Sequence, residues 1–394
     1  MEGPLKGVRV IDLTTMISGP FATMILGDQG ADVIKVERPG GGDQMRRYGR
    51  NSGALSAPFV NNNRNKRSIT IDLKSPLGVD IVRRLIVNAD VVIQNFRPGV
   101  IKKLGLGYER ICDVQPDIVY VSISGFGDTG PFADKPAYDP IIQAVSGLAS
   151  IQGGSDLERP RMIRAMLPDK LAALTITQAI TAALYVKAST GEGQEIKLSM
   201  LDSVLSFLWS GEMDGHTFLE NLVEGPEEMT PFDLIYQTKD GYICVATVTD
   251  GQWQGFAEAV GHAEWLNDPR FNTSKAREIH RSERLALMQE VLRSGKTDDW
   301  LERLEAADVP CAKTYTRSEI VKHPHILESK TLVEYGHGSA GPIRQARHPA
   351  RFSKTKAEAM RPPPLLGQHT DEILKAAGYS SNKIDNLRNN GIID

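Results

Sequence analysis

The chain has 394 residues and a formal net charge of −3 at pH 7, with 24% charged and 41% hydrophobic residues. Because this length exceeds what one hydrophobic core normally supports, we expect two domains. The small net charge gives no sign of nucleic-acid binding. No run approaches eighteen apolar residues, so the sequence predicts neither a membrane-spanning segment nor a membrane partner.

The three cysteines, Cys112, Cys244 and Cys311, lie far apart and form no CxxC pair. This spacing argues against a disulfide framework or a zinc site and favours reduced cysteines. The first charged strand begins by residue 9, which leaves no room for the apolar core of a signal peptide. We therefore expect a cytoplasmic protein.

The N-terminal region contains two β-rich runs, 5–13 and 30–39, separated by about fifteen residues of helix-compatible sequence. This order is typical of a βαβ unit with parallel strands. The turn after the first run, 14–20, has neither a GxGxxG pattern nor a Walker lysine. The chain thus begins like a nucleotide-binding fold but lacks both familiar phosphate loops.

Strand and helix patterns continue to alternate, which predicts a Rossmann-like, doubly wound α/β domain with a mainly parallel sheet. Ligands of such sheets bind beyond the carboxyl ends of the strands. The expected strands are 69–73, 89–95, 118–124 and 195–199, and the expected helical regions are 77–88, 100–114, 140–188 and 201–218.

The character of the sequence changes at 220–228, a polar stretch with a Gly-Pro pair that indicates a linker. A hairpin pattern at 234–247 follows, and then helical patterns at 252–260, 282–294 and 297–307, where Thr297 is the expected N-cap. We divide the chain into a large domain at 1–220, a small α+β domain at 229–325, and a linker and tail at 326–394. The tail includes a helix at 370–377 that ends before Gly378.

Basic residues gather near the expected ligand edge of the sheet. Arginine and lysine beside glycine-rich turns suit a ligand that carries phosphate, although a solvated charged rim would give the same pattern. The cluster comprises Arg38, Arg46, Arg47, Arg64, Lys66, Arg67, Lys74, Arg97, Lys102 and Lys103.

Asp169 follows Pro168 and precedes a long apolar helix. It could cap that helix, since aspartate at a helix start often binds backbone amides. A helix N-terminus would also keep the carboxylate ionised, as a nucleophile requires. The eight histidines form no metal-ligand pattern, and there is no GxSxG serine motif, so we expect neither a metal site nor a serine hydrolase.

Several ordered blocks together resemble the class III CoA-transferases, the formyl-CoA transferase and carnitine-CoA transferase type, whose family also contains the α-methylacyl-CoA racemases. The resemblance implies a Rossmann-like domain completed by the returning C-terminal tail, a small domain, and two chains interlocked as a homodimer. The matching blocks are 5–43, 65–69, 95–99, 138–147, the segment around Asp169, 190–194 and 366–370.

The resemblance also implies which residues contact coenzyme A, which would be a substrate rather than a tightly bound cofactor. Ile17, Ser18 and Arg38 would line the nucleotide, and Lys135 and Tyr138 would lie near the thioester. The ribose, phosphates and pantetheine would be held by Asp72, Leu73, Lys74, Asn95, Phe96, Arg97 and Lys103. Position 103 often carries arginine in the family, so lysine keeps the positive charge but lacks the planar guanidinium that can bind an anion through two parallel hydrogen bonds.

Asp169 occupies the position of the family's catalytic carboxylate. The resemblance implies that it attacks an acyl-CoA to form an aspartyl-acyl anhydride, and that CoA then converts this anhydride into an aspartyl thioester. The acceptor acid would reverse both steps. The stretch 248–255 lacks the four-glycine run of some members, which weakens a formyl-CoA/oxalate assignment.

Three alternatives remain at this point. A racemase of the same fold would need a second acid/base, but this chain has Tyr138 where such racemases carry histidine. A dehydrogenase would need the missing glycine fingerprint, and a non-catalytic CoA-binding protein would not need Asp169. We expect a transferase that moves CoA from a donor such as succinyl-CoA to a small carboxylic acid. Arg161, Arg164 and Lys170 could bind a distal carboxylate, or belong to a solvated loop.

Overall fold

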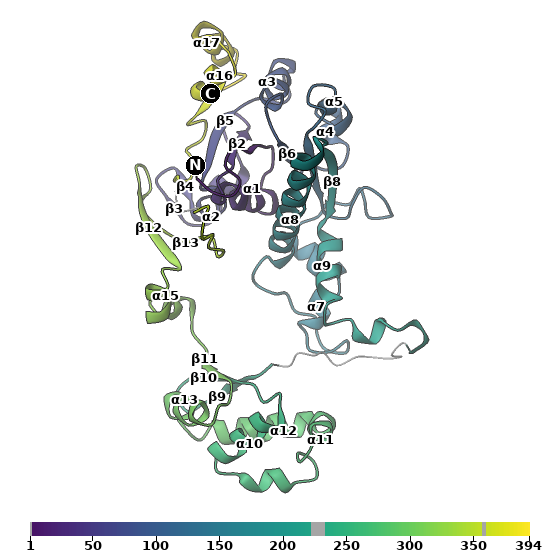
Figure 1. Ribbon diagram of the computed structural model, residues 1–394, viewed down its shortest axis with the longest axis vertical. Helices are drawn as coiled ribbons and strands as arrows, with labels where there is room; N and C mark the ends of the chain where they lie inside the picture. The colour runs from purple at the N-terminus through teal and green to yellow at the C-terminus, as the bar shows by residue number, and fades with distance from the viewer. Residues whose placement is uncertain (1, 222–232, 357–359) are drawn as a thin grey trace. The chain divides into compact units, whose positions relative to one another are not determined.

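The computed structural model describes residues 2–221, 233–356 and 360–394, and the chain divides into two compact units (Figure 1). One unit comprises 1–229 and 332–394, and the other comprises 230–331. The second unit thus extends beyond 325, because the helix that begins at Pro324 belongs to it. Most of the expected linker, 222–228, lies outside the described residues.

The larger unit is built on a six-stranded sheet in which every neighbouring pair is parallel. This confirms the parallel α/β sheet expected from the alternating sequence pattern. The spatial order is β5 (Lys66–Thr70), β2 (Asp32–Glu37), β1 (Arg9–Asp12), β6 (Val91–Gln94), β7 (Val119–Ser124) and β8 (Gln194–Ser199).

Helices pack on both faces of this sheet, because successive strand residues point to opposite sides. In β1, Val10 joins one hydrophobic cluster and Ile11 joins the other. The face of Val10 is covered by α1 (Ser18–Asp28), α6 (Asp139–Val145), α7 (Leu148–Ile151), α8 (Leu167–Thr190) and α9 (Met200–Leu208). The face of Ile11 is covered by α3 (Pro76–Ile86), α4 (Val100–Lys103), α5 (Tyr108–Cys112), α16 (Thr370–Ala376) and α17 (Ser381–Asn389).

The strand order reverses between β1 and β6. The chain first builds outward from β1 through β2 to β5, and then returns to the other side of β1 to add β6, β7 and β8. Such a reversal opens a crevice at the carboxyl ends of the two central strands, which is where ligands bind in open parallel sheets. The fold therefore places the turns after β1 and β6 at the expected binding edge.

Three expected helical regions are shorter than the sequence pattern indicated. The region 100–114 is split into α4 and α5 around Gly105, whose φ of 71° is in the left-handed range. The region 140–188 contains α6, α7 and α8, with turns and irregular chain at 152–166. The region 201–218 keeps only α9 and a 3-10 turn, η2 (Asp214–His216), and another such turn, η3 (Leu219–Asn221), follows it.

The C-terminal segment returns to β5 at the edge of the sheet. The amide of His369 donates to the carbonyl of Ser68, and the amide of Asp394 donates to the hydroxyl of Thr70. A hairpin of β12 (Leu332–His337) and β13 (Gly341–Ala346), which the sequence pattern missed, lies in the same unit. The remaining elements are η1 (Gln44–Arg47), β3 (Asn51–Ser52), β4 (Leu55–Ser56) and α2 (Ala57–Asn63).

The second unit is a small α+β structure with the antiparallel strand order β11-β10-β9. Thr297 does not cap its helix as expected, because Lys296 is the N-cap and the Thr297 hydroxyl donates to Asp240. Its strands are β9 (Ile235–Gln237), β10 (Tyr242–Val245) and β11 (Cys311–Lys313). Its helices are α10 (Asp250–Ala259), η4 (Ala263–Asn267), α11 (Ser274–Ile279), α12 (Arg281–Leu292), α13 (Thr297–Ala306), α14 (Arg317–Ile320) and α15 (Pro324–Glu328).

Among the helices of the described segments, α8 alone is long and apolar enough to cross a membrane, judged by its 24 residues and its composition. Five of its residues, Ala172, Ala173, Ile176, Ile180 and Ala183, are buried in the cluster that packs on the sheet. Its first turn contains both Asp169 and Lys170. We therefore interpret α8 as a core helix of the α/β unit.

Candidate active site

Asp169 lies in the first turn of α8 at the edge of the core. The N-cap of this helix is Met166, with a left-handed φ of 41°, and no side chain caps the helix. The suggestion that Asp169 serves as the cap is therefore wrong, since Asp169 is already inside the helix. Its carboxylate is instead free for other contacts near the positive end of the helix dipole.

The backbone amide of Asp169 binds a second acid. It donates a hydrogen bond to Oδ2 of Asp139, with an N–O distance of 3.2 Å. Asp139 is 4% exposed, and its other oxygen accepts from Nε2 of Gln143 at 2.7 Å. Because Gln143 lies one helical turn after Asp139 on α6, the two side chains share one face of that helix.

The pKa of Asp169 is raised to about 6, mainly because the carboxyl group is buried and secondly because Asp139 carries a like charge. Hydrogen bonds from the hydroxyl and backbone amide of Ser18 oppose this increase, as does the charge of Lys170. At pH 7 a carboxyl group with this pKa is still about nine-tenths ionised. Asp169 is thus a desolvated carboxylate that faces the first residue of α1.

The turn that carries Ser18 is fixed across the crevice by Asn95. Oδ1 of Asn95 accepts from the amide of Thr15 at 3.0 Å, and Nδ2 of Asn95 donates to the carbonyl of Thr15 at 2.8 Å. One side-chain amide therefore holds both polar groups of a residue that follows β1, from a position that follows β6. This assigns Asn95 a contact that the sequence did not predict.

Buried charged residues hold the rest of the same turn. The amide of Thr14 donates to Asp12 at 2.9 Å, and its carbonyl accepts from Nζ of Lys35 at 2.9 Å. The amide of Met16, which has a left-handed φ of 71°, donates to Asp43 at 3.2 Å. Three successive residues before α1 are therefore held by side chains from neighbouring strands and loops.

These buried charges form two ion pairs. Nζ of Lys66 lies 3.1 Å from Asp12, and Nζ of Lys35 lies 3.0 Å from Asp43, with all four side chains 0% exposed. Burial opposes ionisation of Asp12, but Lys66 and Lys35 outweigh it and hold the pKa of Asp12 well below its usual range. Burial lowers the pKa of Lys66 to about 8. The network keeps opposite charges together beneath the turn.

For four members of the basic cluster, the structure shows neither a solvated rim nor a free ligand-binding group, because each pairs with a carboxylate of the protein. Lys66 pairs with Asp12, and three buried arginine side chains also pair with internal carboxylates. The arginine pairs are Arg46 with Glu37 at 2.7 Å, Arg64 with Asp28 at 2.6 Å, and Arg67 with Asp32 at 2.6 Å. Their carboxylate partners lie between nine and thirty-six residues away in the sequence, so no short motif marks these pairs.

Several other predicted CoA-contact residues remain at the surface. Leu73, Lys74 and Lys103 line one cavity of about 280 Å³ beside α3 and α4. Arg97 is exposed beyond β6, and Arg38 is exposed beyond β2, where its Nε donates to the carbonyl of Gly42 at 3.2 Å. Exposed cations therefore follow several strand ends, and two of these cations, Lys74 and Lys103, line the same cavity as Leu73.

The other residues predicted to contact CoA differ in exposure. Ile17 is 8% exposed in a hydrophobic cluster, which leaves only its backbone for a ligand. Phe96 packs against the core, and the carboxylate of Asp72 accepts from the amide of Lys74. Tyr138 is 59% exposed directly before Asp139. Nζ of Lys135 lies 3.9 Å from the ring centre of Phe132.

Sequence reasoning missed the roles of Asp139 and Gln143. The sequence did contain a signal for this pair, because an acid and an amide four residues apart at the start of a helix lie on the same face. What the sequence could not show was that this face meets the first turn of α8, thirty residues later.

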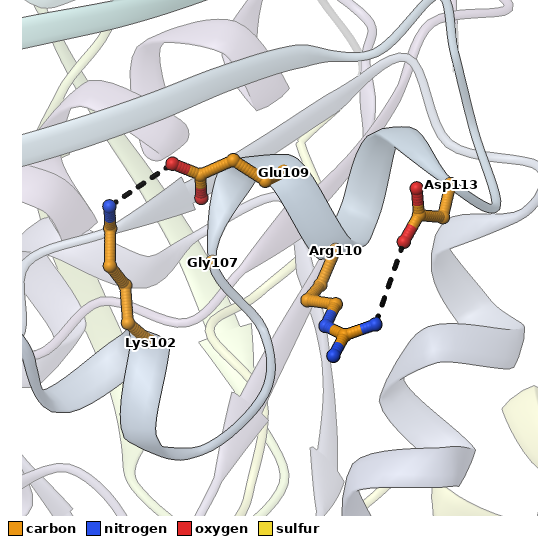
Figure 2. A pocket seen from close by; sticks show the side chains of 5 residues that line it. All are labelled: Lys102, Gly107, Glu109, Arg110 and Asp113. Carbon is orange, nitrogen blue, oxygen red and sulfur yellow. Dashed lines mark hydrogen bonds and ion pairs between the residues drawn. The ribbon is translucent and has the colours of Figure 1, made fainter.

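The described residues contain no group of three or more histidine, cysteine, aspartate or glutamate side chains arranged to hold a metal ion. A cavity near α5 has its charges already paired, as Figure 2 shows. Lys102 pairs with Glu109 at 3.1 Å, and Arg110 pairs with Asp113 at 4.0 Å. These internal pairs leave little charge there for an anionic ligand.

Comparison with known proteins places this geometry in a family. The family model described as "CoA-transferase family III" matches residues 5–370. The chain belongs to CoA-transferase family III. This family III enzyme is 36% identical over 398 residues to the human succinyl-CoA:glutarate CoA-transferase, which covers 99% of this chain and 90% of the relative.

Two further relatives agree with this assignment. The formyl-CoA:oxalate CoA-transferase of Escherichia coli is 30% identical over 419 residues and covers 100% of both chains. The crystal structure of a CAIB/BAIF family protein from Brucella suis is similar with a TM-score of 0.83 and 32% identity, covering 96% of this chain and 100% of that chain. The present protein is therefore a CoA-transferase of family III, with CoA thioesters as substrates.

Proposed function

We propose that this transferase moves CoA from succinyl-CoA to a small carboxylic acid and that Asp169 is its nucleophile. The observation that carries the proposal is the position of the Asp169 carboxylate. It is largely desolvated, has a pKa of about 6, and meets the hydroxyl and amide of Ser18 at the start of α1. A desolvated carboxylate is a stronger nucleophile than a hydrated one and remains ionised at neutral pH.

In the first step, an oxygen of Asp169 attacks the carbonyl carbon of the acyl-CoA. A new C–O bond forms, the C–S bond breaks, and the CoA thiolate leaves with the electron pair of that bond. The product is a mixed anhydride between Asp169 and the acyl group. No proton needs to move, because a carboxylate attacks and a thiolate departs.

In the second step, the thiolate attacks the carbonyl carbon of Asp169 itself. A C–S bond forms, the anhydride C–O bond breaks, and the donor acid is released as a carboxylate. The enzyme then carries CoA as an aspartyl thioester. The acceptor carboxylate attacks this thioester to form a second anhydride, from which the thiolate takes the acceptor acyl group and restores Asp169.

Each attack places negative charge on a carbonyl oxygen, and backbone amides of a helix N-terminus are suited to stabilise it. We assign this role to the amide and hydroxyl of Ser18, which hydrogen-bond the Asp169 carboxylate. The fixed turn before Ser18 supports this role, because donors that are already oriented need no reorganisation during the reaction.

For the CoA moiety, we propose that the cations beyond the strand ends bind its phosphates. Lys74 and Lys103 share one cavity with Leu73, which could hold an apolar part of the ligand. Arg38 and Arg97 are exposed beyond β2 and β6, the two strands that flank β1. Asn95 would act indirectly by holding the turn after β1, since both polar groups of its side chain bind Thr15.

The substrate proposal rests on the named relatives. The more similar of the two curated relatives uses succinyl-CoA and glutarate by its name, and the less similar one uses formyl-CoA and oxalate. The stretch 248–255 forms the start of α10, where Thr249 and Gln252 make a capping box, rather than a glycine-rich loop. This favours a succinyl-CoA donor over the oxalate type, and Tyr138 in place of histidine disfavours a racemase.

We further propose that the active form is a cytoplasmic, interlocked homodimer. Helices α8 and α9 expose large apolar side chains, among them Leu174, Tyr185, Phe207 and Trp209, at 54%, 77%, 46% and 50%. Exposed large apolar side chains along two helices that contact each other are compatible with an interface. Sedimentation of the purified protein should give twice the chain mass, and a monomer at micromolar concentration would contradict the dimer.

The reaction is tested by incubating the enzyme with succinyl-CoA and a panel of free acids that includes glutarate and oxalate. The proposal expects new acyl-CoA products that depend on the added acid, with glutarate preferred to oxalate. Absence of transfer to any acid, together with deuterium exchange at C2 of a 2-methylacyl-CoA, would favour the racemase instead.

A further inference from the structure

A cavity of about 800 Å³ opens in the irregular segment between α7 and α8. Its wall is formed by Gln152 and by residues 159–164, which include three arginines. We call it the arginine cavity. The structure records no hydrogen bond or ion pair for the side chains of Arg159, Arg161 and Arg164 with any described residue. Three unpaired guanidinium groups around one space favour an anionic ligand.

The backbone that carries these arginines is held in place. The amide of Arg161 donates to the carbonyl of Ala149 at 2.8 Å. The side chain of Gln143 binds both polar groups of Ile163, accepting from its amide at 2.9 Å and donating to its carbonyl at 3.1 Å. A fixed backbone reduces the cost of ordering the arginines around a ligand.

The same Gln143 connects the arginine cavity with the nucleophile. Its amide nitrogen also donates to Asp139, and Asp139 accepts from the backbone of Asp169. Arg164 and Asp169 are five positions apart, so their Cα atoms are at most about 18 Å apart, and less because α8 begins between them. The cavity wall and the nucleophile are therefore joined by a short segment of chain and by the hydrogen bonds of Gln143 and Asp139.

We propose that the arginine cavity binds the second carboxylate of a dicarboxylic substrate whose first carboxylate reacts at Asp169. This inference rests on the proposed transferase function and specifies its substrate class. Lys170 is not part of the subsite, because its Nζ donates to the carbonyl of Ala165 at 2.7 Å. The forked geometry of arginine matches a carboxylate through two parallel hydrogen bonds.

The test compares two acceptors that differ by one carboxylate, glutarate and valerate, with succinyl-CoA as donor. The native enzyme should prefer glutarate in kcat/KM. The variants Arg161→Gln and Arg164→Gln should each reduce this preference about tenfold or more, chiefly by raising KM for glutarate. Arg110→Gln removes an equivalent charge from the paired cavity in Figure 2 and should leave the preference unchanged.

A second measurement separates the subsite from the transferase function and from CoA binding. Glutarate binding, followed by ligand-observed NMR, should weaken in the Arg161 and Arg164 variants, whereas affinity for free CoA should stay the same. If the variants lose affinity for CoA but keep the glutarate preference, the cavity binds phosphate and the inference is overturned. If the native enzyme transfers CoA to no acid yet glutarate binding still needs the arginines, the reaction fails and the subsite stands.

Discussion

The backbone amide of Asp169 donates a hydrogen bond to the carboxylate of Asp139 across 3.2 Å, so an acid on α6 positions the start of α8. This contact also brings two negative charges close together, and the charge of Asp139 contributes to the raised pKa of Asp169. One residue therefore orients the proposed nucleophile and makes it more basic.

The variants Asp139→Asn and Lys170→Gln should shift the pH dependence of the reaction in opposite directions. Rate should fall as Asp169 becomes protonated, with an acidic limb near pH 6 in the native enzyme. Removing the charge of Asp139 should move this limb to lower pH, and removing that of Lys170 should move it to higher pH, each by about half a unit or more. The measurement is kcat/KM against pH, and shifts of the same sign would count against the model.

The variant Asp169→Asn should stabilise the protein at pH 8. The folded pKa is about 6 and the ordinary value is 3.8, so the folded state binds a proton more tightly than the unfolded state. Ionised Asp169 therefore costs stability above pH 6, and this cost disappears as the pH falls toward 4. Urea unfolding should show a gain of about 1–3 kcal/mol at pH 8 and none at pH 4. An equal effect at both pH values would mean that the charge is not responsible.

The variant Asn95→Ala should reduce kcat more than it raises KM for acyl-CoA. Its side chain makes two hydrogen bonds to Thr15 and so orients the turn that carries Ser18. Losing both should cost about tenfold in kcat. Asn62→Ala, which removes a single hydrogen bond to Pro58, is the matched control. A large rise in KM with unchanged kcat would instead support the sequence-based hypothesis that Asn95 contacts CoA directly.

The variant Lys66→Met should destabilise the fold strongly. Its ammonium group is the partner of Asp12 in a fully buried pair, and its removal leaves that carboxylate without its closest cation. Loss of one member of a buried pair costs about 3–5 kcal/mol. Lys6→Met breaks the exposed pair with Glu2 and should have a much smaller effect in the same urea titration, because solvent screens this pair. Similar effects for both variants would show that the buried network contributes little.

Much of the fold was predictable because its signals are local. The β-branched runs of β1 and β2 and the helix between them follow directly from residue type and spacing. The helix breaks at Gly105 and in 152–166 were harder to predict, because helix-compatible residues there adopt turns under tertiary constraints. The β12–β13 hairpin was missed because it falls in the stretch 326–394, which was interpreted as a linker and tail.

The site was only partly predictable for a related reason. Local sequence left Asp169 open between a helix cap and a nucleophile, and only the family resemblance gave it an expected catalytic role. The effects of Asp139 and Ser18 on the pKa of Asp169 depend on contacts between residues far apart in the sequence, which no local pattern contains. Similarly, Arg46, Arg64 and Arg67 could not be distinguished from ligand-binding arginines without the structure, which shows their carboxylate partners.

The central claim is that Asp169 carries CoA covalently, and intact-mass analysis tests it most directly. Enzyme incubated with succinyl-CoA and quenched in acid should gain the mass of CoA less one water, and peptide mapping should place the adduct on Asp169. The adduct should disappear on addition of glutarate and should not form in Asp169→Ala. A CoA adduct on another residue, or an Asp169→Ala enzyme that transfers CoA at the native rate, would contradict the account.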